Sequence, residues 1–544
     1  LFLFSFFISG VPRVYTQTAA HALFIEAYGA AALPWAYLAE ALCVPLAGYL
    51  YLVAERRLSL GRLMVATLAS QVVALLLFHQ GVAAGIPLVA GASIVYFEIE
   101  FVLSSLLLWG LANQLMNLRQ GKRLFGFVSA GEPVAIIVCG LSTPLLLRWL
   151  APADLFLQSA LGAVVGIVLV QHILRHHAPL APSAEAASDA EAAPSPRPWW
   201  QDPYVRTLVV LVLVGQMAYF FVDNAFYVEA DKRFPDEHAM ASFLGLYSAV
   251  MGAVSLVCSV LLAPWLLRRF GVRGGLLVLP VLLLLGSLAT VLLGGLGGPA
   301  DLLFWLVVGN KVIDQSFRYT LDKTTFVTLF QPLPARQRLR VQAGLEGMVE
   351  PLSGGLAGVL LFVLIQGLGF GAVGITAVIL GVACVWTGLV AVQYRGYLSS
   401  LRTALAGRRV SAERLSLDDP QSRQLLRQGL RSARAGEVIY SLSLLDGIDE
   451  TLGADEVASL LRHAAPEVRL ELARRIEDGR TPVLPTLLRE VLSGEPDARV
   501  RSALVRALAA LGDETLPEVA AWLDHPDPVL ALGARVGLIR HGGV

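Results

Sequence analysis

Long apolar runs constrain this chain more than any other feature, because each is long enough to cross a lipid bilayer. A spanning helix needs roughly 20 apolar residues to cover about 30 Å of hydrocarbon. Runs of that length recur along residues 1–396, whereas residues 397–544 are rich in Arg and Glu. Only 15% of the chain is charged, against about 25% in soluble domains. The sequence therefore predicts an all-α membrane protein with a soluble C-terminal segment.

The apolar runs divide into two sets of six expected spans, separated by a linker. The Ala-, Pro-, Ser- and Glu-rich composition of 176–204 cannot bury a core and predicts a flexible linker. The first half covers 1–175 and the second 205–396; we expect the first helix to be truncated, since Leu1 lies inside an apolar run. The spans are 1–16, 33–54, 60–79, 86–115, 124–149, 154–175, 205–230, 239–267, 272–295, 300–330, 341–368 and 370–396.

The two halves echo each other. Glu132-Pro133 in span five recurs as Glu350-Pro351 in span eleven, and an Arg-rich loop follows the second span of each half. Many secondary transporters are built from such repeats, with the substrate site at the midplane between them. The pattern therefore favours a duplicated 6+6 helical bundle.

Segment 397–544 has its own repeat. Val438, Val468, Val500 and Val529 open similar amphipathic segments at a spacing of roughly 30 residues. Stacked helix pairs of this kind resemble HEAT repeats, which form a small α-solenoid with an extended surface for partners. We expect this domain to be regulatory, with an unknown protein partner or a missing downstream domain as its contact; a rigid stabilising cap is the alternative.

Ionisable residues inside spans are costly and must find partners. In span ten, Lys311, Asp314, Arg318 and Asp322 follow at steps of three, four and four, which keeps them on one helical face. One interpretation is a cavity wall where Lys311 and Arg318 bind an anion. The other is a ladder of ion pairs with nothing left to bind a solute. Lys323 lies off this face, and we expect it to pair with Glu346 or Glu350.

Other candidates lie in spans one, four, five, seven and eleven. We expect Arg13, Gln17 and Asn113 to bind the solute, with Glu98, Glu100 and Asp223 as charge partners. Glu132 and Glu350 precede prolines inside spans, where a proline frees a backbone carbonyl. Each is either a proton site or gate, or a partner of the basic loops. Glu40 is expected at the membrane interface.

Several functions are disfavoured by what the sequence contains. The formal net charge is zero, so nothing favours nucleic-acid binding. We find no phosphate-cradling loop, nucleophile elbow or metal motif, and therefore expect no enzymatic activity and no cofactor. The four cysteines each lie alone in an apolar run.

Particular motifs resemble the bacterial and plastid ATP/ADP translocases. They are Phe6-Phe7-Ile8 to Arg13 and Leu33-Pro34, Leu108 to Asn113 with Gly121 to Phe125, and Arg318 to Lys323 with Pro332-Leu333-Pro334. The resemblance covers most of 1–396 and implies a major-facilitator-like fold, in which the first helix of each three-helix unit lines the cavity. Relatives with HEAT repeats exist in bacteria. However, the family's Arg-Asp-Thr-Lys cluster is here Arg13-Val14-Tyr15-Thr16-Gln17, which puts ATP in doubt as the substrate.

The sequence thus predicts a secondary transporter that moves a small anionic, phosphorylated or nucleotide-like solute by alternating access. It would lie in a bacterial inner membrane, in contact with lipid. The alternatives are a proton-driven exporter or lipid flippase, and a non-transporting membrane sensor or scaffold.

The basic loops predict the orientation. Four loops rich in Arg and Lys all fall on one side of the twelve-span arrangement. They contain Arg56, Arg57 and Arg62; Arg119, Lys122 and Arg123; Arg268, Arg269 and Arg273; and Arg336, Arg338 and Arg340. The positive-inside rule makes that side cytoplasmic, together with both termini and the linker. In a cysteine-free background, Ser188→Cys should therefore resist an impermeant thiol reagent in intact cells, whereas His238→Cys, a control in the opposite loop between the spans 205–230 and 239–267, should react. Labelling of Ser188→Cys from outside would reverse the orientation.

Overall fold

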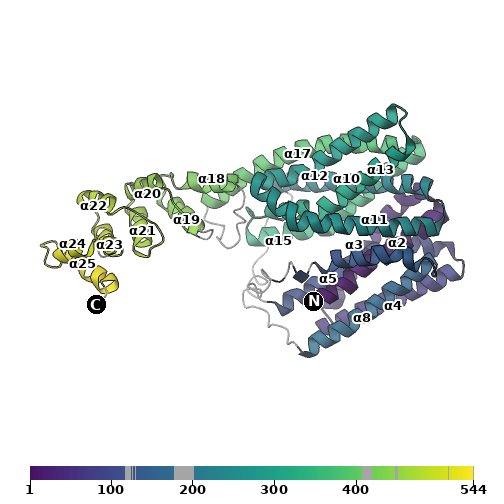
Figure 1. Ribbon diagram of the computed structural model, residues 1–544, viewed down its shortest axis with the longest axis horizontal. Helices are drawn as coiled ribbons and strands as arrows, with labels where there is room; N and C mark the ends of the chain where they lie inside the picture. The colour runs from purple at the N-terminus through teal and green to yellow at the C-terminus, as the bar shows by residue number, and fades with distance from the viewer. Residues whose placement is uncertain are drawn as a thin grey trace. The chain divides into compact units, whose positions relative to one another are not determined.

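The apolar runs fold into long helices, which Figure 1 shows side by side in the membrane part. The computed structural model describes residues 1–116, 124, 127–128, 130–176, 201–406, 420–446, 451–512 and 514–542. The basic residues Arg119, Lys122 and Arg123 and most of the linker lie outside these ranges. Residues 1–330 and 335–396 form one compact unit, and the chain from Tyr397 forms another together with 331–334.

The first half of the membrane part consists of α1 (Phe2–Ser5), η1 (Phe6–Gly10), α2 (Val11–Tyr28), η2 (Ala30–Ala32), α3 (Leu33–Glu55), α4 (Leu60–Ala83), α5 (Pro87–Leu115), α7 (Gly131–Leu146), η3 (Pro152–Asp154) and α8 (Leu155–His176). The second half consists of α10 (Pro203–Arg233), α11 (Glu237–Val257), η5 (Cys258–Leu262), α12 (Ala263–Gly295), α13 (Ala300–Phe317), η6 (Arg318–Asp322), α14 (Lys323–Thr328), α15 (Ala335–Gly344), η7 (Leu345–Val349), α16 (Glu350–Phe362), η8 (Val363–Gly367) and α17 (Ala372–Ala406).

These elements make the twelve crossings expected from the sequence. Among the described residues, eight helical segments are long and apolar enough to span a membrane, and one of them, Glu237–Gly295, has 59 residues. It bends at Gly271, whose φ of 63° suits glycine, and so accounts for two crossings. The shorter or more polar crossings are the first helix, α7, and α13 with its continuation.

Two predicted boundaries were wrong. The first helix runs on to Tyr28, beyond the predicted end at 16, because its polar residues are buried inside the bundle. It ends where Gly29 adopts a φ of 73°. The last span, α17, continues to Ala406, beyond the predicted end at 396.

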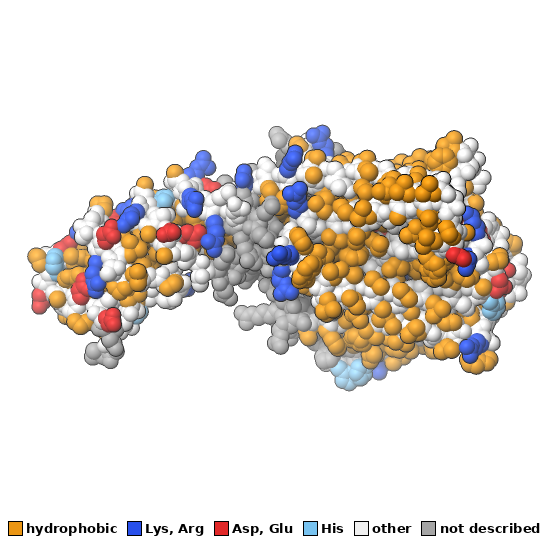
Figure 2. Space-filling model, turned by 45° about the horizontal axis from the view of Figure 1, so that its top comes forward, with side chains coloured by type: hydrophobic (Ala, Val, Ile, Leu, Met, Phe, Trp, Pro, Cys, Tyr) orange, Lys and Arg blue, Asp and Glu red, His pale blue; other side chains and the backbone are white. Residues whose placement is uncertain are grey.

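The outer surface of the membrane part is apolar. Figure 2 shows hydrophobic side chains over its visible face, with Lys and Arg gathered towards the ends. Exposed large side chains include Leu42, Leu46 and Leu50 on α3. An apolar belt of this kind can contact the hydrocarbon of a bilayer. The hydrophobic side chains of these helices therefore face lipid as well as the core.

The two halves touch along α7 with α11 and along α3 with α16. At Gly140 of α7, an added Cβ would lie 2.6 Å from the backbone nitrogen of Ala249 and 2.6 Å from the carbonyl oxygen of Gly245. At Gly358 of α16, it would lie 2.9 Å from the carbonyl oxygen of Pro34. Pro34 begins α3 and Gly140 lies in the second half of α7, so both approaches lie away from the Arg56–Arg57 turn that follows α3. The halves are therefore in close contact away from this turn, and a Cβ at Gly252 of α11 would also lie 2.8 Å from Ile136, nearer the start of α7.

The C-terminal unit is a series of short helices: α18 (Pro420–Gly429), α19 (Ala435–Asp446), α20 (Ala454–Leu461), α21 (Pro466–Glu477), α22 (Pro485–Gly494), α23 (Ala498–Ala509), α24 (Leu516–Ala521) and α25 (Pro528–His541). Helices α19, α21, α23 and α25 pack in succession. The four repeated valines all lie in the first turn of these helices. The 30-residue repeat is therefore confirmed as a repeated structure, while its kinship to HEAT repeats stays a prediction.

Polar contacts join successive repeats of this unit. The Arg469 guanidinium donates two hydrogen bonds of 2.8 Å to Glu495. Asp497 begins α23 by accepting from the backbone N–H groups of Arg499 and Val500. The Arg499 guanidinium and these N–H groups hold the pKa of the Asp497 carboxyl below its usual value. This cap is therefore strongest above the ordinary pKa of an aspartate and is lost as acid protonates the group.

We expect Gly140→Ala to lower the thermal stability of the membrane part by the equivalent of roughly 1–3 kcal/mol, the usual cost of overpacking. Its methyl group would push α7 away from the α11 backbone. Gly48→Ala is the matched control, since a Cβ at Gly48 meets nothing within 4 Å, and alanine favours helix over glycine. Unfolding of the two purified variants would be compared; equal midpoints would refute the close contact.

Candidate functional site

Buried charges collect on the helices that begin each three-helix unit. Arg13 is on α2, Glu100 on α5, Asp223 on α10, and Lys311 and Asp314 on α13. Each of these residues is at least nine-tenths buried. Since apolar side chains cover the lipid-facing surface, the interior of the bundle is the candidate site.

Lys311 and Asp223 form a buried ion pair between α13 and α10. The Lys311 side chain is 1% exposed, and its Nζ lies 2.5 Å from Asp223 Oδ1. The Tyr37 hydroxyl donates to the other oxygen, Oδ2, at 2.6 Å. Tyr37 is on α3 in the first half, so this contact also joins the halves. Lys311 Nζ lies 4.7 Å from the centre of the Tyr219 ring.

Arg318 and Asp314 form a second pair one turn further on. Arg318 Nη2 donates to Asp314 Oδ1 at 2.5 Å, and Nε donates to Oδ2 at 3.2 Å. The guanidinium carbon lies 5.4 Å from both the Tyr219 and the Trp386 ring centres. Arg318 begins the π-helical turn η6, and such turns often mark functional sites. Lys311 and Arg318 therefore each have a carboxylate partner, as the ion-paired alternative requires.

Arg13 is bound differently from these two cations. Its guanidinium carbon lies 4.3 Å from the Phe101 ring centre, 5.3 Å from Tyr319 and 6.0 Å from Phe97. Among the described residues, none supplies a carboxylate oxygen within 4 Å of it, although Glu98 and Glu132 act on it at longer range. We call Phe97, Phe101 and Tyr319 the aromatic shelf. Arg13 is thus held by ring faces, with its N–H donors free of an ion pair.

Gln17, one turn after Arg13, lies at a stacked aromatic pair. Its side chain lies close enough to the Tyr227 hydroxyl to act on it. Its backbone carbonyl is 2.9 Å from His21 Nδ1. The His21 and Tyr227 rings stack with centroids 4.5 Å apart. This stack joins α2 to α10, and so crosses between the halves.

The predicted acidic residues fall into two groups. Glu98 is half-buried and within electrostatic range of Arg13, Asp223 and Lys311. Asp322 is half-buried and interacts with Arg318 and Asp314. Both therefore belong to the interior polar network, whereas Glu100 lies apart from these charges, since none of them acts on its carboxyl.

The proline-linked glutamates lie at the basic-loop end. Glu132 is in the first turn of α7, half-buried, and its charge acts on Arg13. Glu350 begins α16 and interacts with Lys323 and Glu346. Lys323 is exposed, and its Nζ lies 3.8 Å from Glu346 Oε1, as the sequence predicted.

Sequence reasoning missed part of the site. Glu40 lies within electrostatic range of Glu98 and Asp223, so its expected place at the membrane interface was wrong. It follows Tyr37 by three residues and shares that face of α3. Tyr219, Asp223 and Tyr227 follow one another at steps of four, a signal that could have been found in the sequence. Asn113 is in α5, but its side chain lies outside the described residues.

Carboxyl groups outnumber cations in the described interior. The cations are Arg13, Lys311 and Arg318; the carboxyl groups are Glu40, Glu98, Glu100, Asp223, Asp314 and Asp322. Unpaired charge in a low-dielectric interior is costly. The balance is therefore unsuited to a solute that carries many negative charges, unless some of the carboxyl groups are protonated.

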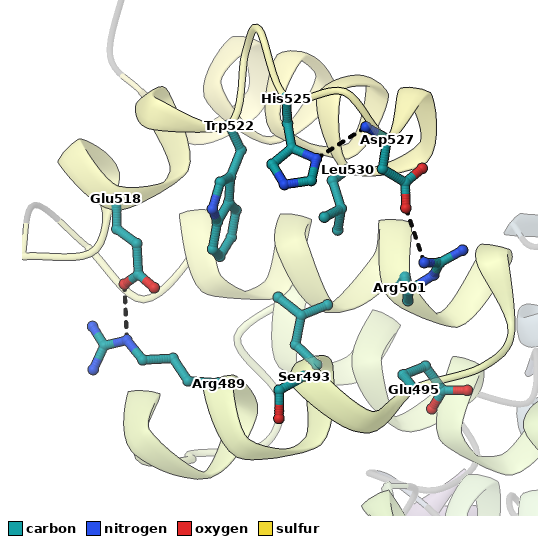
Figure 3. Close-up of a pocket in the computed structure, with 10 residues that line it drawn as sticks. Arg489, Ser493, Glu495, Arg501, Glu518, Trp522, His525, Asp527 and Leu530 are labelled. Atoms are coloured by element: carbon teal, nitrogen blue, oxygen red, sulfur yellow. Dashed lines mark hydrogen bonds and ion pairs between the residues drawn. The ribbon is translucent and has the colours of Figure 1, made fainter.

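A surface pocket of about 420 Å³ lies in the C-terminal unit. Figure 3 shows Trp522, His525 and Leu530 above Arg489 and Ser493. Its charges are paired: Arg489 with Glu518 at 2.8 Å, and Arg501 with Asp527 at 2.9 Å. The positive and negative charges that line the pocket therefore neutralise one another, and the pocket does not favour a charged ligand.

The comparisons with known proteins bear on the membrane part. Residues 185–397 match the family model described as TLC ATP/ADP transporter. This stretch is similar to TLC transporters. The TLC match supports the resemblance noted in the sequence, and it concerns a family of transporters, not of enzymes.

Relatives of the TLC-like chain include ADP,ATP carrier protein 1 of Chlamydia pneumoniae. It is 22% identical over 281 residues, which cover 45% of this chain and 54% of that protein. The chloroplastic ADP,ATP carrier protein 1 of Arabidopsis thaliana is also 22% identical, over 47% of this chain and 45% of that protein. The chain thus matches only about half the length of these carriers.

Solved structures confirm the fold. The D-xylose-proton symporter has a TM-score of 0.51 at 12% identity, covering 72% of this chain and 94% of that one. The nucleoside transporter NupG has a TM-score of 0.50 at 12% identity, covering 73% and 98%. The TLC-like chain is therefore an all-helical membrane protein with the fold of these transporters and an additional C-terminal helical region.

We expect Lys311→Met or Asp223→Asn alone to cost roughly 3–5 kcal/mol, because each leaves a buried charge without its partner. The double variant should recover most of that loss, since the side-chain carbonyl of the introduced asparagine can still accept from Tyr37. A double-mutant cycle on thermal unfolding would measure the coupling. Neutralising the exposed Arg233–Asp301 pair is the matched control and should change stability by at most about 1 kcal/mol. Additive effects at Lys311 and Asp223 would contradict the ion pair.

Proposed function

We propose that this chain is a secondary transporter that moves a small anionic organic solute by alternating access. The family match and the fold support transport; the solute class rests on Arg13. A phosphorylated metabolite or a nucleotide is the candidate, since the two relatives described above are named as ADP and ATP carriers. We place it in a bacterial inner membrane, with both termini in the cytoplasm.

The contacts between halves fit one state of an alternating-access cycle. Close approaches at Gly140 and Gly358 join the halves away from the Arg56–Arg57 turn. Tyr319, above Arg13, is 47% exposed. With the basic loops in the cytoplasm, as the positive-inside rule predicts, this arrangement corresponds to a cytoplasm-open state. Transport would require the Tyr37–Asp223 and His21–Tyr227 contacts to break as the halves rock.

Arg13 is the proposed anion contact because its donors are not used by a carboxylate. Lys311 and Arg318 are each paired with a carboxylate. They would therefore stabilise the packing of α10 and α13 and contribute to the electrostatic potential around the solute. The rings of the aromatic shelf offer flat apolar surface beside the guanidinium, which suits a planar organic group next to an anionic one. The excess of carboxyl groups favours a solute with few negative charges over a triphosphate.

We expect Arg13→Gln to weaken anion binding at least tenfold, because a hydrogen bond to a charged group contributes about 1.5–3 kcal/mol. Arg13→Lys should retain part of the affinity, since it keeps the charge but not the planar fork. Calorimetric titration of purified protein with AMP, ADP, ATP and sugar phosphates would measure this. Arg148→Gln, at an exposed arginine, is the matched control. Unchanged affinity in Arg13→Gln would place the site elsewhere.

We also propose that the C-terminal unit regulates transport through a protein partner or a further domain. Its repeats expose mixed charges, and exposed ion pairs contribute only about 0–1 kcal/mol each. Such contacts are weak enough to be adjusted. A coupling of about 1–3 kcal/mol would suffice to bias the two rocking states.

A variant that ends at Ala406 should fold with a normal yield but show a changed transport rate or solute affinity. Leu504→Asp is the companion variant, because it charges a fully buried position of α23 and disrupts the unit without shortening the chain. Both would be compared with the full chain in proteoliposomes. Unchanged function in both would refute regulation, and loss of the folded membrane part would favour a stabilising cap.

A further inference from the structure

A second polar cluster lies inside the first half, separate from the Lys311 and Arg318 pairs. It combines side chains from four helices, and each of them is at most 3% exposed. Its members are Thr16 of α2, Gln71 of α4, Glu100 and Ser104 of α5, and Ser159 of α8. The proposed transport mechanism has not used this cluster.

The hydrogen bonds of defined geometry in this cluster join its neutral members. The Thr16 hydroxyl, which lies beside Glu100, donates to Ser159 Oγ at 2.8 Å. Gln71 Nε2 donates to Ser104 Oγ at 3.4 Å. Glu100 is 1% exposed, and neither of its oxygens has a hydrogen-bond partner among the described residues. The nearest donor to this buried carboxyl is thus the Thr16 hydroxyl, which is already engaged by Ser159.

The charged surroundings of Glu100 are equally sparse. Of the described groups, Tyr96 on α5 is the titratable one that shares an electrostatic interaction with it. The facing side chains from α2, α4 and α8 are the neutral Thr16, Gln71 and Ser159. An ionised carboxylate here would lose its water with only the Thr16 hydroxyl nearby, which is costly in a low-dielectric interior. The protonated form loses far less and has an O–H of its own to donate.

We propose that Glu100 is a proton-binding site whose proton is transported together with the anionic solute. This inference rests on the proposed function for its coupling step, but not for the proton site itself. The proton enters from water on one side of the membrane, resides on a Glu100 oxygen, and leaves to water on the other side. No other bond is made or broken.

The sequence neighbours of Glu100 give the coupling a physical route. Phe97 and Phe101, three residues before and one after Glu100, form the part of the aromatic shelf that belongs to α5. Arg13 precedes Thr16 by three residues, so both lie on the same side of α2. In this arrangement none of the interior cations acts on the Glu100 carboxyl, so the coupling would run through the packing of α2 against α5. A change of charge at Glu100 would reach the solute site by shifting these two helices, which carry Arg13 and the two phenylalanines.

Infrared difference spectroscopy tests the proton site without any solute. Purified wild-type protein in lipid should show a protonated-carboxyl C=O band that disappears at alkaline pH. The band should be missing in Glu100→Gln, which keeps the shape of the protonated side chain, and shifted in Glu100→Asp. Glu55→Gln, at an exposed carboxylate, should leave it unchanged. Identical spectra for the wild type and Glu100→Gln at every pH would overturn the proposal.

Proteoliposomes loaded with AMP test the coupling. Wild-type protein should accumulate labelled AMP when the side of uptake is made acidic, and Glu100→Gln should lose at least tenfold of that accumulation. The variant should still exchange labelled for unlabelled AMP without a gradient. Accumulation equal to that of the wild type would overturn the coupling. A sodium gradient that drives uptake in the wild type but not in Glu100→Gln would reassign the site to sodium. Absence of AMP transport in the wild type would count against the proposed function, while the infrared result would stand.

Discussion

The low dielectric of the bundle interior is the constraint on which the rest of this structure depends. Every charge placed there must be matched by another charge, by a hydrogen bond or by the electron-rich face of a ring. The contact of Lys311 with Asp223 and Tyr37 uses the first two of these solutions at once. Because Tyr37 belongs to the other half, the electrostatic requirement of one helix pair also holds two six-helix units in register.

The three interior cations illustrate different answers to the same requirement. Arg318 is neutralised within its own helix by Asp314, so its charge is fixed wherever that helix moves. Lys311 is neutralised across helices, and its pairing therefore depends on how α10 and α13 pack. Arg13 depends on Phe97, Phe101 and Tyr319, and rings attract a cation less strongly than a carboxylate does. The cation with the weakest compensation is the one best able to accept a new partner.

Much of the fold could be predicted from the sequence because lipid imposes a simple rule on helix length and polarity. The twelve crossings and the soluble repeats follow from that rule and from the spacing of valines. The end of the first helix could not be predicted, because the polar residues Gln17 and His21 interrupt the apolar run and their interior partners cannot be seen in the sequence. Glu40 was misplaced for the same reason, since its neighbours come from α5 and α10. The pairing of Lys311 with Asp223 joins residues 88 positions apart, and no local pattern contains that information.

The π-helical turn η6 has a consequence for how this chain is compared with others. A π turn holds one more residue than the α-helical turn it replaces, and each residue of an α-helix rotates by about 100°. A relative whose same residues form an ordinary α-helical turn would present Asp322 and Lys323 in different directions relative to Arg318. An alignment without gaps across Arg318–Asp322 would then equate residues that face different surroundings. Positions downstream of η6 should therefore be compared by the direction in which their side chains point, not by their order in the chain.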